Sequence, residues 1–230
     1  MENLSENNII EIGGILSSNI EFSHEVYGEK FYKFFIETKR LSNSTDSIPV
    51  IVSERLIKLE ELNKGDILHI RGQFRSYNKQ IQNMKSKLIL SVFAKEIEKT
   101  EDESICTLNE ATFLGYICKP PIYRKTPLGR EISDILIAVN RSYKKSDYIP
   151  CILWGRNAKF CESLEIGANV NLSGRIQSRK YEKKYADGTV EEKVAYELSV
   201  SKFFLVNEEN EEEKQGVEYN VNETNDIQNI

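Results

Sequence analysis

Aromatic and basic side chains are interleaved in two stretches of the second half of the chain. Residues 141–148 hold two tyrosines among one arginine and two lysines, and residues 179–181 read Arg-Lys-Tyr. Exposed aromatic rings can stack on nucleobases, while neighbouring cations neutralise phosphates. This spacing favours a surface that binds single-stranded nucleic acid. The alternatives for the same residue types are packing of the rings in a core and a solvated basic face.

The remaining candidate residues show no pattern suited to catalysis or metal binding. Neither of the two histidines, His24 and His69, stands at a spacing from a nucleophile or from further ligands that such sites use. We interpret the four cysteines, which form no C-x-x-C pair, as reduced and mostly buried thiols: Cys106, Cys118, Cys151 and Cys161. We therefore expect a protein that is not an enzyme and needs neither a cofactor nor a metal.

The charge is divided unevenly along the 230 residues. Residues 1–103 hold 14 basic and 17 acidic side chains (−3), residues 104–206 hold 16 and 11 (+5), and residues 207–230 hold 1 and 8 (−7). The net charge of −5 thus hides a basic second half, and the local charge decides attraction to phosphates. No apolar run approaches the roughly 20 residues of a membrane span, and residues 1–8 lack the features of a signal peptide. We expect a cytoplasmic protein without a membrane partner.

These residues must be positioned by a fold, and the chain contains that fold twice. At an offset of 101 residues, Gly14 aligns with Gly115 and Asp46 with Asp147. At an offset of 102 residues the matching pairs are Leu62/Leu164, Gly65/Gly167, Gly72/Gly174 and Ser76/Ser178. A spacing of about 100 residues is the size of a domain, so the repeat indicates a duplicated domain.

Each copy shows the element order of a small β-barrel. In the first copy we expect strands at residues 9–18, 31–39, 48–53, 67–77 and 87–97, a polar loop at 19–30 and a short helix at 54–62. In the second copy we expect strands at 111–118, 132–140, 149–154, 168–181 and 192–206, loops at 119–129 and 182–189, and a short helix at 157–164. Five strands with a helix between the third and fourth is the order of the OB-fold.

The fold prediction is an all-β chain of two tandem five-stranded OB-fold barrels, each with a short helix between strands 3 and 4. The first barrel is expected at residues 8–98, a charged linker at 99–106 and the second barrel at 107–206. Residues 207–230 are rich in Glu and Asn with little to bury, so we expect a disordered acidic tail.

The second copy resembles bacterial single-stranded DNA-binding proteins of the OB-fold type, here in a tandem two-barrel form. The matching segments are Ala138-Val-Asn-Arg-Ser-Tyr143, Asp147-Tyr148, Ile152-Leu-Trp-Gly-Arg156, Gly167, Gly174-Arg175 and Arg179-Lys-Tyr181. The resemblance implies that four aromatic residues stack on bases: Tyr143, Tyr148, Trp154 and Tyr181. The candidate phosphate contacts are the basic residues around them: Arg124, Lys125, Arg141, Lys144, Arg156, Arg175, Arg179 and Lys180. For Trp154, core packing remains the alternative.

The first copy departs from this pattern at all four aromatic positions, which are Leu41, Ser47, Ser53 and Lys79. We expect its barrel to bind DNA weakly or not at all, and to provide a subunit interface or a surface for a protein. The family commonly assembles four OB domains, so the resemblance implies a homodimer of this chain. Family members often recruit replication or repair proteins through an acidic tail. Here residues 225–230 lack the usual run of acids ending in Pro and Phe.

The leading hypothesis is sequence-independent binding and protection of single-stranded DNA in replication, repair or recombination, in a bacterial cytoplasm at the nucleoid. Two alternatives stay open. The barrels could be protein-interaction modules, or they could bind single-stranded RNA, because an OB groove accepts either polymer.

Overall fold

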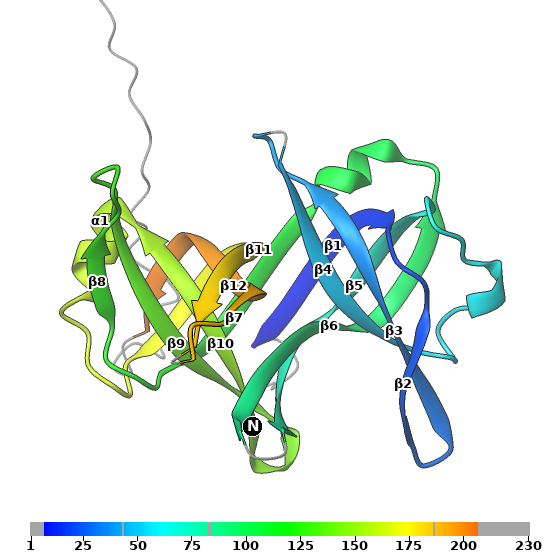
Figure 1. Ribbon diagram of the computed structural model, residues 1–230, viewed down its shortest axis with the longest axis horizontal. Coiled ribbons are helices and arrows are strands. Elements are labelled where there is room, and N and C mark those ends of the chain that lie inside the picture. Colours follow the sequence, from blue (N-terminus) through cyan, green and yellow to red (C-terminus); the bar gives the residue numbers. More distant parts are fainter. Residues whose placement is uncertain (1–6, 43, 82–83, 186, 207–230) are drawn as a thin grey trace, which may run out of the picture.

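The computed structural model describes residues 7–42, 44–81, 84–185 and 187–206, and these residues are built mainly from β-strands (Figure 1). The segment 207–230, expected as an acidic tail, lies outside the described residues.

The first barrel contains six strands: β1 (Asn8–Leu16), β2 (Glu21–Val26), β3 (Glu29–Lys39), β4 (Thr45–Ser53), β5 (Ile67–Ile81) and β6 (Met84–Thr100). Five of them close a barrel in the order β1-β3-β4-β6-β5-β1, and the β4–β6 pair is the parallel one. The sixth strand, β2, is added to the open edge of β3.

The second barrel repeats this order with β7 (Asn109–Ile117), β8 (Ile122–Lys125), β9 (Glu131–Arg141), β10 (Lys145–Trp154), β11 (Asn169–Lys184) and β12 (Val190–Leu205). It closes as β7-β9-β10-β12-β11-β7, again with one parallel pair, β10–β12. The prediction of two tandem OB-fold barrels is therefore confirmed.

Two expected loops contain strands. The polar loop at 19–30 holds β2, and the loop at 119–129 holds β8, each paired with the strand that follows it. All six residues of β2 are exposed, so it buries no face against the core. A strand without a buried face leaves no alternation of buried and exposed residues for the sequence to show, and its polar composition is typical of a loop.

The two expected helices differ. In the second barrel, α1 (Gly155–Cys161) begins two residues before the expected start and ends three before the expected end. In the first barrel, the helix expected over 54–62 is reduced to a 3-10 turn, η1 (Leu59–Glu61). Ile57, Leu59 and Leu62 of that stretch still pack on the core, and Leu62 is only 8% exposed. Burial of these side chains produced the helical periodicity, although the backbone makes only a turn.

The segment expected as a charged linker, residues 99–106, is ordered against the first barrel. Strand β6 continues to Thr100, and η2 (Glu103–Thr107) follows it, with Asp102 accepting a hydrogen bond from Ser104 N at 2.9 Å. A Cβ added to Gly13 of β1 would lie 2.1 Å from Ile105 Cγ2, so the glycine makes room for this turn.

The barrels share one continuous sheet because β1 pairs with β7 in antiparallel register, from Asn8↔Phe113 to Ile12↔Asn109. Their buried side chains form one core, and Phe74 of the first barrel packs against Phe113 of the second with ring centroids 6.3 Å apart. The long strands also cross the junction, because β5 contacts β10 and β11 contacts β4. The two barrels therefore pack against each other through β1 and β7 and through these further strand contacts.

All four cysteines are unpaired, and three of them, Cys106, Cys151 and Cys161, are buried. Burial raises the pKa of the Cys161 thiol to about 11 and that of Cys151 well above its ordinary value. Thiolate is the reactive form, so the structure keeps these side chains inert.

Candidate nucleic-acid interface

Strand β10 presents two of the expected aromatic residues on the outer face of the second barrel. Its inward residues alternate with Tyr148 and Trp154, which are 41% and 38% exposed. The indole of Trp154 donates from Nε1 to Ser199 Oγ of the neighbouring β12 at 3.2 Å. The side chain of Trp154 therefore lies on the surface of the sheet, and the core-packing alternative is wrong.

The other two expected aromatic residues lie on different elements. Tyr181, 39% exposed, extends from β11, where the Arg179 guanidinium carbon lies 5.9 Å from its ring centroid. Tyr143, 94% exposed, stands in η3 (Ser142–Lys144), the turn that leads into β10. Tyr143 and Lys144 both have left-handed backbone angles, φ 63° and 55°, which is unusual for side chains with a Cβ. The turn projects both side chains away from the barrel.

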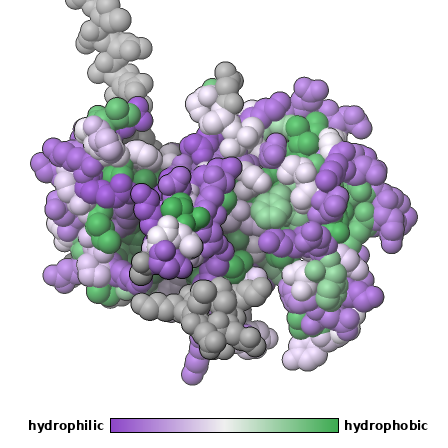
Figure 2. Space-filling view, viewed as in Figure 1, coloured by the Kyte–Doolittle hydropathy of each residue, from purple (hydrophilic) through white to green (hydrophobic). Residues whose placement is uncertain are grey.

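Most of the expected phosphate contacts are paired with acidic side chains. Arg124 Nε lies 2.7 Å from Asp134 Oδ2, and Arg179 Nε lies 3.3 Å from Glu197 Oε1. The hydrogen bond to Glu197 raises the pKa of Arg179. Lys125 and Lys180 pair with Glu131 and Glu192 at 3.6 and 3.1 Å. All four basic side chains remain about half exposed or more, and Figure 2 shows hydrophilic residues over most of the face seen there.

Lys144 and Arg156 differ from these four residues. Among the described residues, neither has an acidic group within 4.0 Å. Lys144 stands beside Tyr143 in the turn before β10, and Arg156 follows Trp154 in the first turn of α1. In the sequence, Lys144 thus adjoins the exposed Tyr143, and Arg156 lies two residues from the exposed Trp154.

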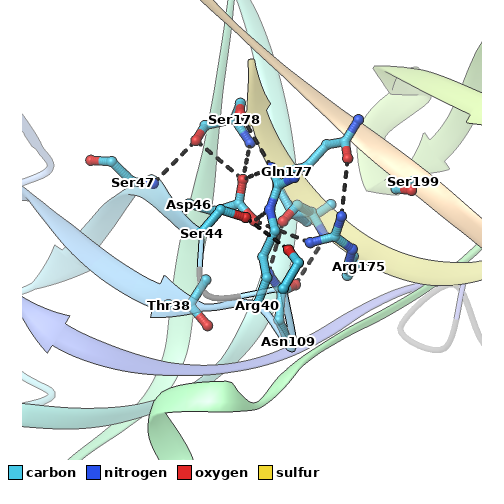
Figure 3. A network of polar contacts seen from close by, with 12 residues as sticks. Thr38, Arg40, Ser44, Asp46, Ser47, Asn109, Arg175, Gln177, Ser178 and Ser199 are labelled. Atoms are coloured by element: carbon cyan, nitrogen blue, oxygen red, sulfur yellow. Dashed lines mark hydrogen bonds and ion pairs between the residues drawn. The ribbon is translucent and has the colours of Figure 1, made fainter. Parts of the chain in front are cut away.

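Two of the expected phosphate contacts are placed elsewhere, at the junction of the barrels. Arg175 lies 3.3 Å from Asp46 of the first barrel, which Arg40 also contacts at 2.7 Å (Figure 3). Arg141 lies 3.4 Å from Asp147. Both carboxylates are fully buried, and a buried charge needs a partner. Arg141 and Arg175, which were expected to contact phosphates, thus each pair with a buried acid, and their side chains are only 27% and 35% exposed.

One aromatic residue beside this surface was not singled out from the sequence. Tyr185 follows β11 four residues after Tyr181, and strand periodicity places such residues on one face. Lys183 and Lys193 have their Nζ atoms 5.0 and 5.5 Å from the Tyr185 ring centroid. The strand period of two residues, continued from Tyr181 to Tyr185, could have predicted this residue from the sequence.

The corresponding face of the first barrel has a different arrangement. Ser53 occupies the position of Trp154 and is buried, while Phe93 of β6 takes the place of Ser199 in the sheet register. The aromatic ring is thus moved to the neighbouring strand. Arg75 covers it, with its guanidinium carbon 3.8 Å from the Phe93 ring centroid.

The other first-barrel candidates also lack a stacking surface like that of β10. Leu41 is 99% exposed, Ser47 lies at the barrel junction, and Phe74 is fully buried. Tyr77 remains exposed, at 55%. The side chain of Lys79 lies outside the described residues.

The described ranges offer neither a metal site nor a membrane-spanning helix. No group of three His, Cys, Asp or Glu residues there is arranged to hold a metal ion. No helix among those residues is long and apolar enough to cross a membrane.

Known proteins match the second barrel by sequence. The model of the single-strand binding protein family matches residues 108–206. Single-stranded DNA-binding protein B of Bacillus subtilis is 36% identical over 84 residues, covering 32% of this chain and 72% of that protein. The single-stranded DNA-binding protein of Clostridium tetani is 34% identical over 89 residues, covering 36% of this chain and 60% of that protein. The chain spans between 48% and 72% of the length of the curated relatives it matches.

A solved structure matches both barrels. The wild-type single-stranded DNA binding protein from Thermus aquaticus superposes with a TM-score of 0.68 at 16% identity, covering 87% of this chain and 93% of that one. At this identity the likeness concerns the fold, and it extends the match to the first barrel, which the family model leaves out.

Proposed function

Because the chain belongs to the single-strand binding protein family, we propose that it binds single-stranded DNA independently of sequence and protects it without catalysis. The second barrel is the proposed binding domain. Its matched relatives are named for this activity, and the match falls on residues 108–206.

The observation that carries the proposal is the outer face of β10. Tyr148 and Trp154 expose roughly two fifths of their surface there, on a strand that pairs with β9 along its length and with β12 at Cys151 and Ile152. Stacking of a base on such a ring contributes about 1–3 kcal/mol and tolerates any base. We propose that Tyr143 and Tyr181 extend this platform at its two ends.

The proposed phosphate contacts are the basic side chains that keep access to solvent. Lys144 and Arg156 are available without rearrangement, since no described acid pairs with them. The side chains of Arg124, Lys125, Arg179 and Lys180 are 47–74% exposed, so a phosphate can replace the carboxylate that each contacts. Exposed ion pairs contribute only about 0–1 kcal/mol, and exchange of the partner therefore costs little.

Trp154 is the single tryptophan of the chain, so its fluorescence reports on the proposed site directly. We expect oligo-dT to quench it, duplex DNA of equal length not to, and the affinity to fall as salt rises. Stronger quenching by oligo-rU than by oligo-dT would favour the RNA alternative. If neither polymer binds, the proposal is wrong and the protein-interaction alternative is favoured.

A pair of tyrosine variants separates the barrels. Tyr148→Leu should weaken binding to labelled oligo-dT by about 1–3 kcal/mol. The matched control is Tyr77→Leu, which removes an exposed tyrosine of the first barrel. We expect the control to bind normally, and a loss of similar size would show that the first barrel also stacks on bases.

We further propose a homodimer that brings four barrels together. Ile9 and Tyr116 are 48% and 36% exposed on β1 and β7, the two strands that join the barrels, and they provide apolar surface for a second copy. Sedimentation equilibrium should give twice the chain mass of 26.5 kDa. We propose that the protein acts in replication, repair or recombination, at the nucleoid in the cytoplasm. We also propose that residues 207–230 recruit partner proteins.

A further inference from the structure

The junction between the barrels contains the same hydrogen bond twice. Ser76 Oγ of β5 accepts from the backbone N–H of Tyr148 in β10 at 2.7 Å. Ser178 Oγ of β11 accepts from the backbone N–H of Ser47 in β4 at 3.1 Å. The two serines are repeat-equivalent, and so are Tyr148 and Ser47, so each barrel holds its partner at the same point.

Each serine is fixed by an aspartate of the barrel that it contacts. Ser76 N donates to Asp147 Oδ1 at 2.6 Å, and Ser178 N donates to Asp46 Oδ1 at 2.7 Å. Ser76 is 6% exposed and both aspartates are fully buried. At each point the aspartate carboxylate accepts a hydrogen bond from the serine N–H, and the serine hydroxyl accepts one from the N–H of the residue that follows the aspartate. We call each such pair of hydrogen bonds a clasp.

These bonds exist because β10 has an open edge. On one side β10 pairs with β9 from Lys145 to Trp154, but on the other it pairs with β12 only at Cys151 and Ile152. The N–H of Tyr148 lies before that second pairing begins, and a buried N–H without a partner is costly. The first barrel supplies the missing acceptor in Ser76.

The repeat is symmetric in geometry, while its consequences differ between the barrels. Ser178 fixes Ser47, which carries no ring, whereas Ser76 fixes Tyr148 of the proposed stacking platform. We propose that Ser76 is a positioning residue for this platform, so that the barrel without a platform sets the geometry of the barrel that has one. The inference rests on the proposed function of the second barrel.

The same clasp reaches the exposed tyrosine before β10. Asp147, which receives the Ser76 N–H, also lies 3.4 Å from Arg141 Nε. Arg141 directly precedes η3, the left-handed turn that holds Tyr143. Two of the four platform residues thus depend on contacts that converge on Asp147.

A platform held before DNA arrives binds more tightly than one that must be ordered on binding, because the entropic cost has been met during folding. Loss of the Ser76 hydroxyl leaves the Tyr148 N–H without its acceptor and frees the edge of β10. We expect Ser76→Ala to weaken binding to labelled oligo-dT roughly three- to tenfold, the range that a single hydrogen bond spans. The slope of log affinity against log salt should stay unchanged, since no phosphate contact is removed.

The matched control is Ser178→Ala, which deletes the equivalent hydroxyl at the same junction. Ser178→Ala should lose at least as much stability in urea as Ser76→Ala, because the Ser178 hydroxyl also lies 3.2 Å from Asp46 Oδ1, but only Ser76→Ala should lose affinity. Ser76→Thr keeps the hydroxyl and should restore binding. Equal affinity losses in the two alanine variants, or no rescue by threonine, would overturn the inference.

A double-mutant cycle with Tyr148→Leu completes the test, because residues that act together show non-additive effects. If Ser76 acts through the Tyr148 ring, adding Ser76→Ala to Tyr148→Leu should leave the affinity unchanged. A further three- to tenfold loss in that background would contradict the positioning role. If Tyr148→Leu alone binds normally, the proposed stacking platform is wrong. The cycle therefore distinguishes failure of the platform from failure of the positioning role.

Discussion

The buried aspartates at the junction, Asp46 and Asp147, are repeat-equivalent, but their surroundings differ. Asp46 accepts hydrogen bonds from Arg40, Arg175 and both the N–H and hydroxyl of Ser178. Asp147 accepts one from Ser76 N–H and has a single longer ion pair, and its Oδ2 has no hydrogen-bond partner among the described residues. We therefore expect Asp46→Asn to destabilise the protein far more than Asp147→Asn.

The magnitude for Asp46 follows from its contacts. An Asn oxygen can keep the Ser178 N–H, but the amide group then faces the donors of two arginines. Hydrogen bonds to charged groups contribute about 1.5–3 kcal/mol, and breaking a buried pair costs about 3–5 kcal/mol. The side chains of Arg40 and Arg175 are 24% and 35% exposed, so water can solvate them afterwards. The expected loss for Asp46→Asn is about 2–4 kcal/mol.

The expected change for Asp147→Asn is about 1 kcal/mol or less in either direction. The Asn oxygen keeps the Ser76 N–H, and the substitution removes a buried charge that is only weakly compensated. Urea unfolding followed by far-UV circular dichroism measures both variants, and an unchanged slope m shows that the same surface is exposed on unfolding. Equal losses in the two variants would refute the reasoning, because the contacts would then not determine the cost.

Three further outcomes follow from the same contacts. Burial raises the pKa of Asp147 above its ordinary value of 3.8. The wild-type chain should therefore lose stability relative to Asp147→Asn as the pH rises from 3.8 through the folded-state pKa. Urea unfolding midpoints measured between about pH 3 and 8 test this. Gly13→Ala should cost about 1–3 kcal/mol in the same unfolding assay, and Ile105→Ala should not rescue it, because the Ile105 carbonyl oxygen would still lie 2.2 Å from the new Cβ. A thiol reagent at pH 8 should modify the half-buried Cys118 before Cys161, and faster modification of Cys161 would mean that the second barrel opens.

The sequence by itself determined the architecture. The repeat at offsets of 101 and 102 residues, with alternating strands and turn glycines, specified two OB-fold barrels in tandem. Such patterns are readable because each strand of a barrel buries one face, and burial imposes a period of two residues. Where a strand buries no residue, as in β2, or only Tyr123, as in β8, the same reasoning had little to detect. The second-barrel aromatic positions were also readable, since they lie at fixed points of a recognised pattern.

Only the tertiary structure decided the role of each charge. Arg124 and Arg175 look alike in sequence, yet one is a half-exposed surface cation and the other neutralises a buried acid of the opposite barrel. The partner, Asp46, is 129 residues away from Arg175. The strength of a charge pair depends on distance and burial, and neither is encoded in local sequence.

The junction itself is the clearest example. The sequence aligned Ser76 with Ser178 and Asp46 with Asp147, but it did not show that these residues meet across two barrels. That arrangement arises because β1 pairs with β7. This pairing brings the open edge of β4 against β11 and the open edge of β10 against β5. Backbone groups left free in one barrel are satisfied by side chains of the other. The fold of each barrel thus follows from its own sequence, while the contacts of Ser76 with Asp147 and Tyr148 require both barrels.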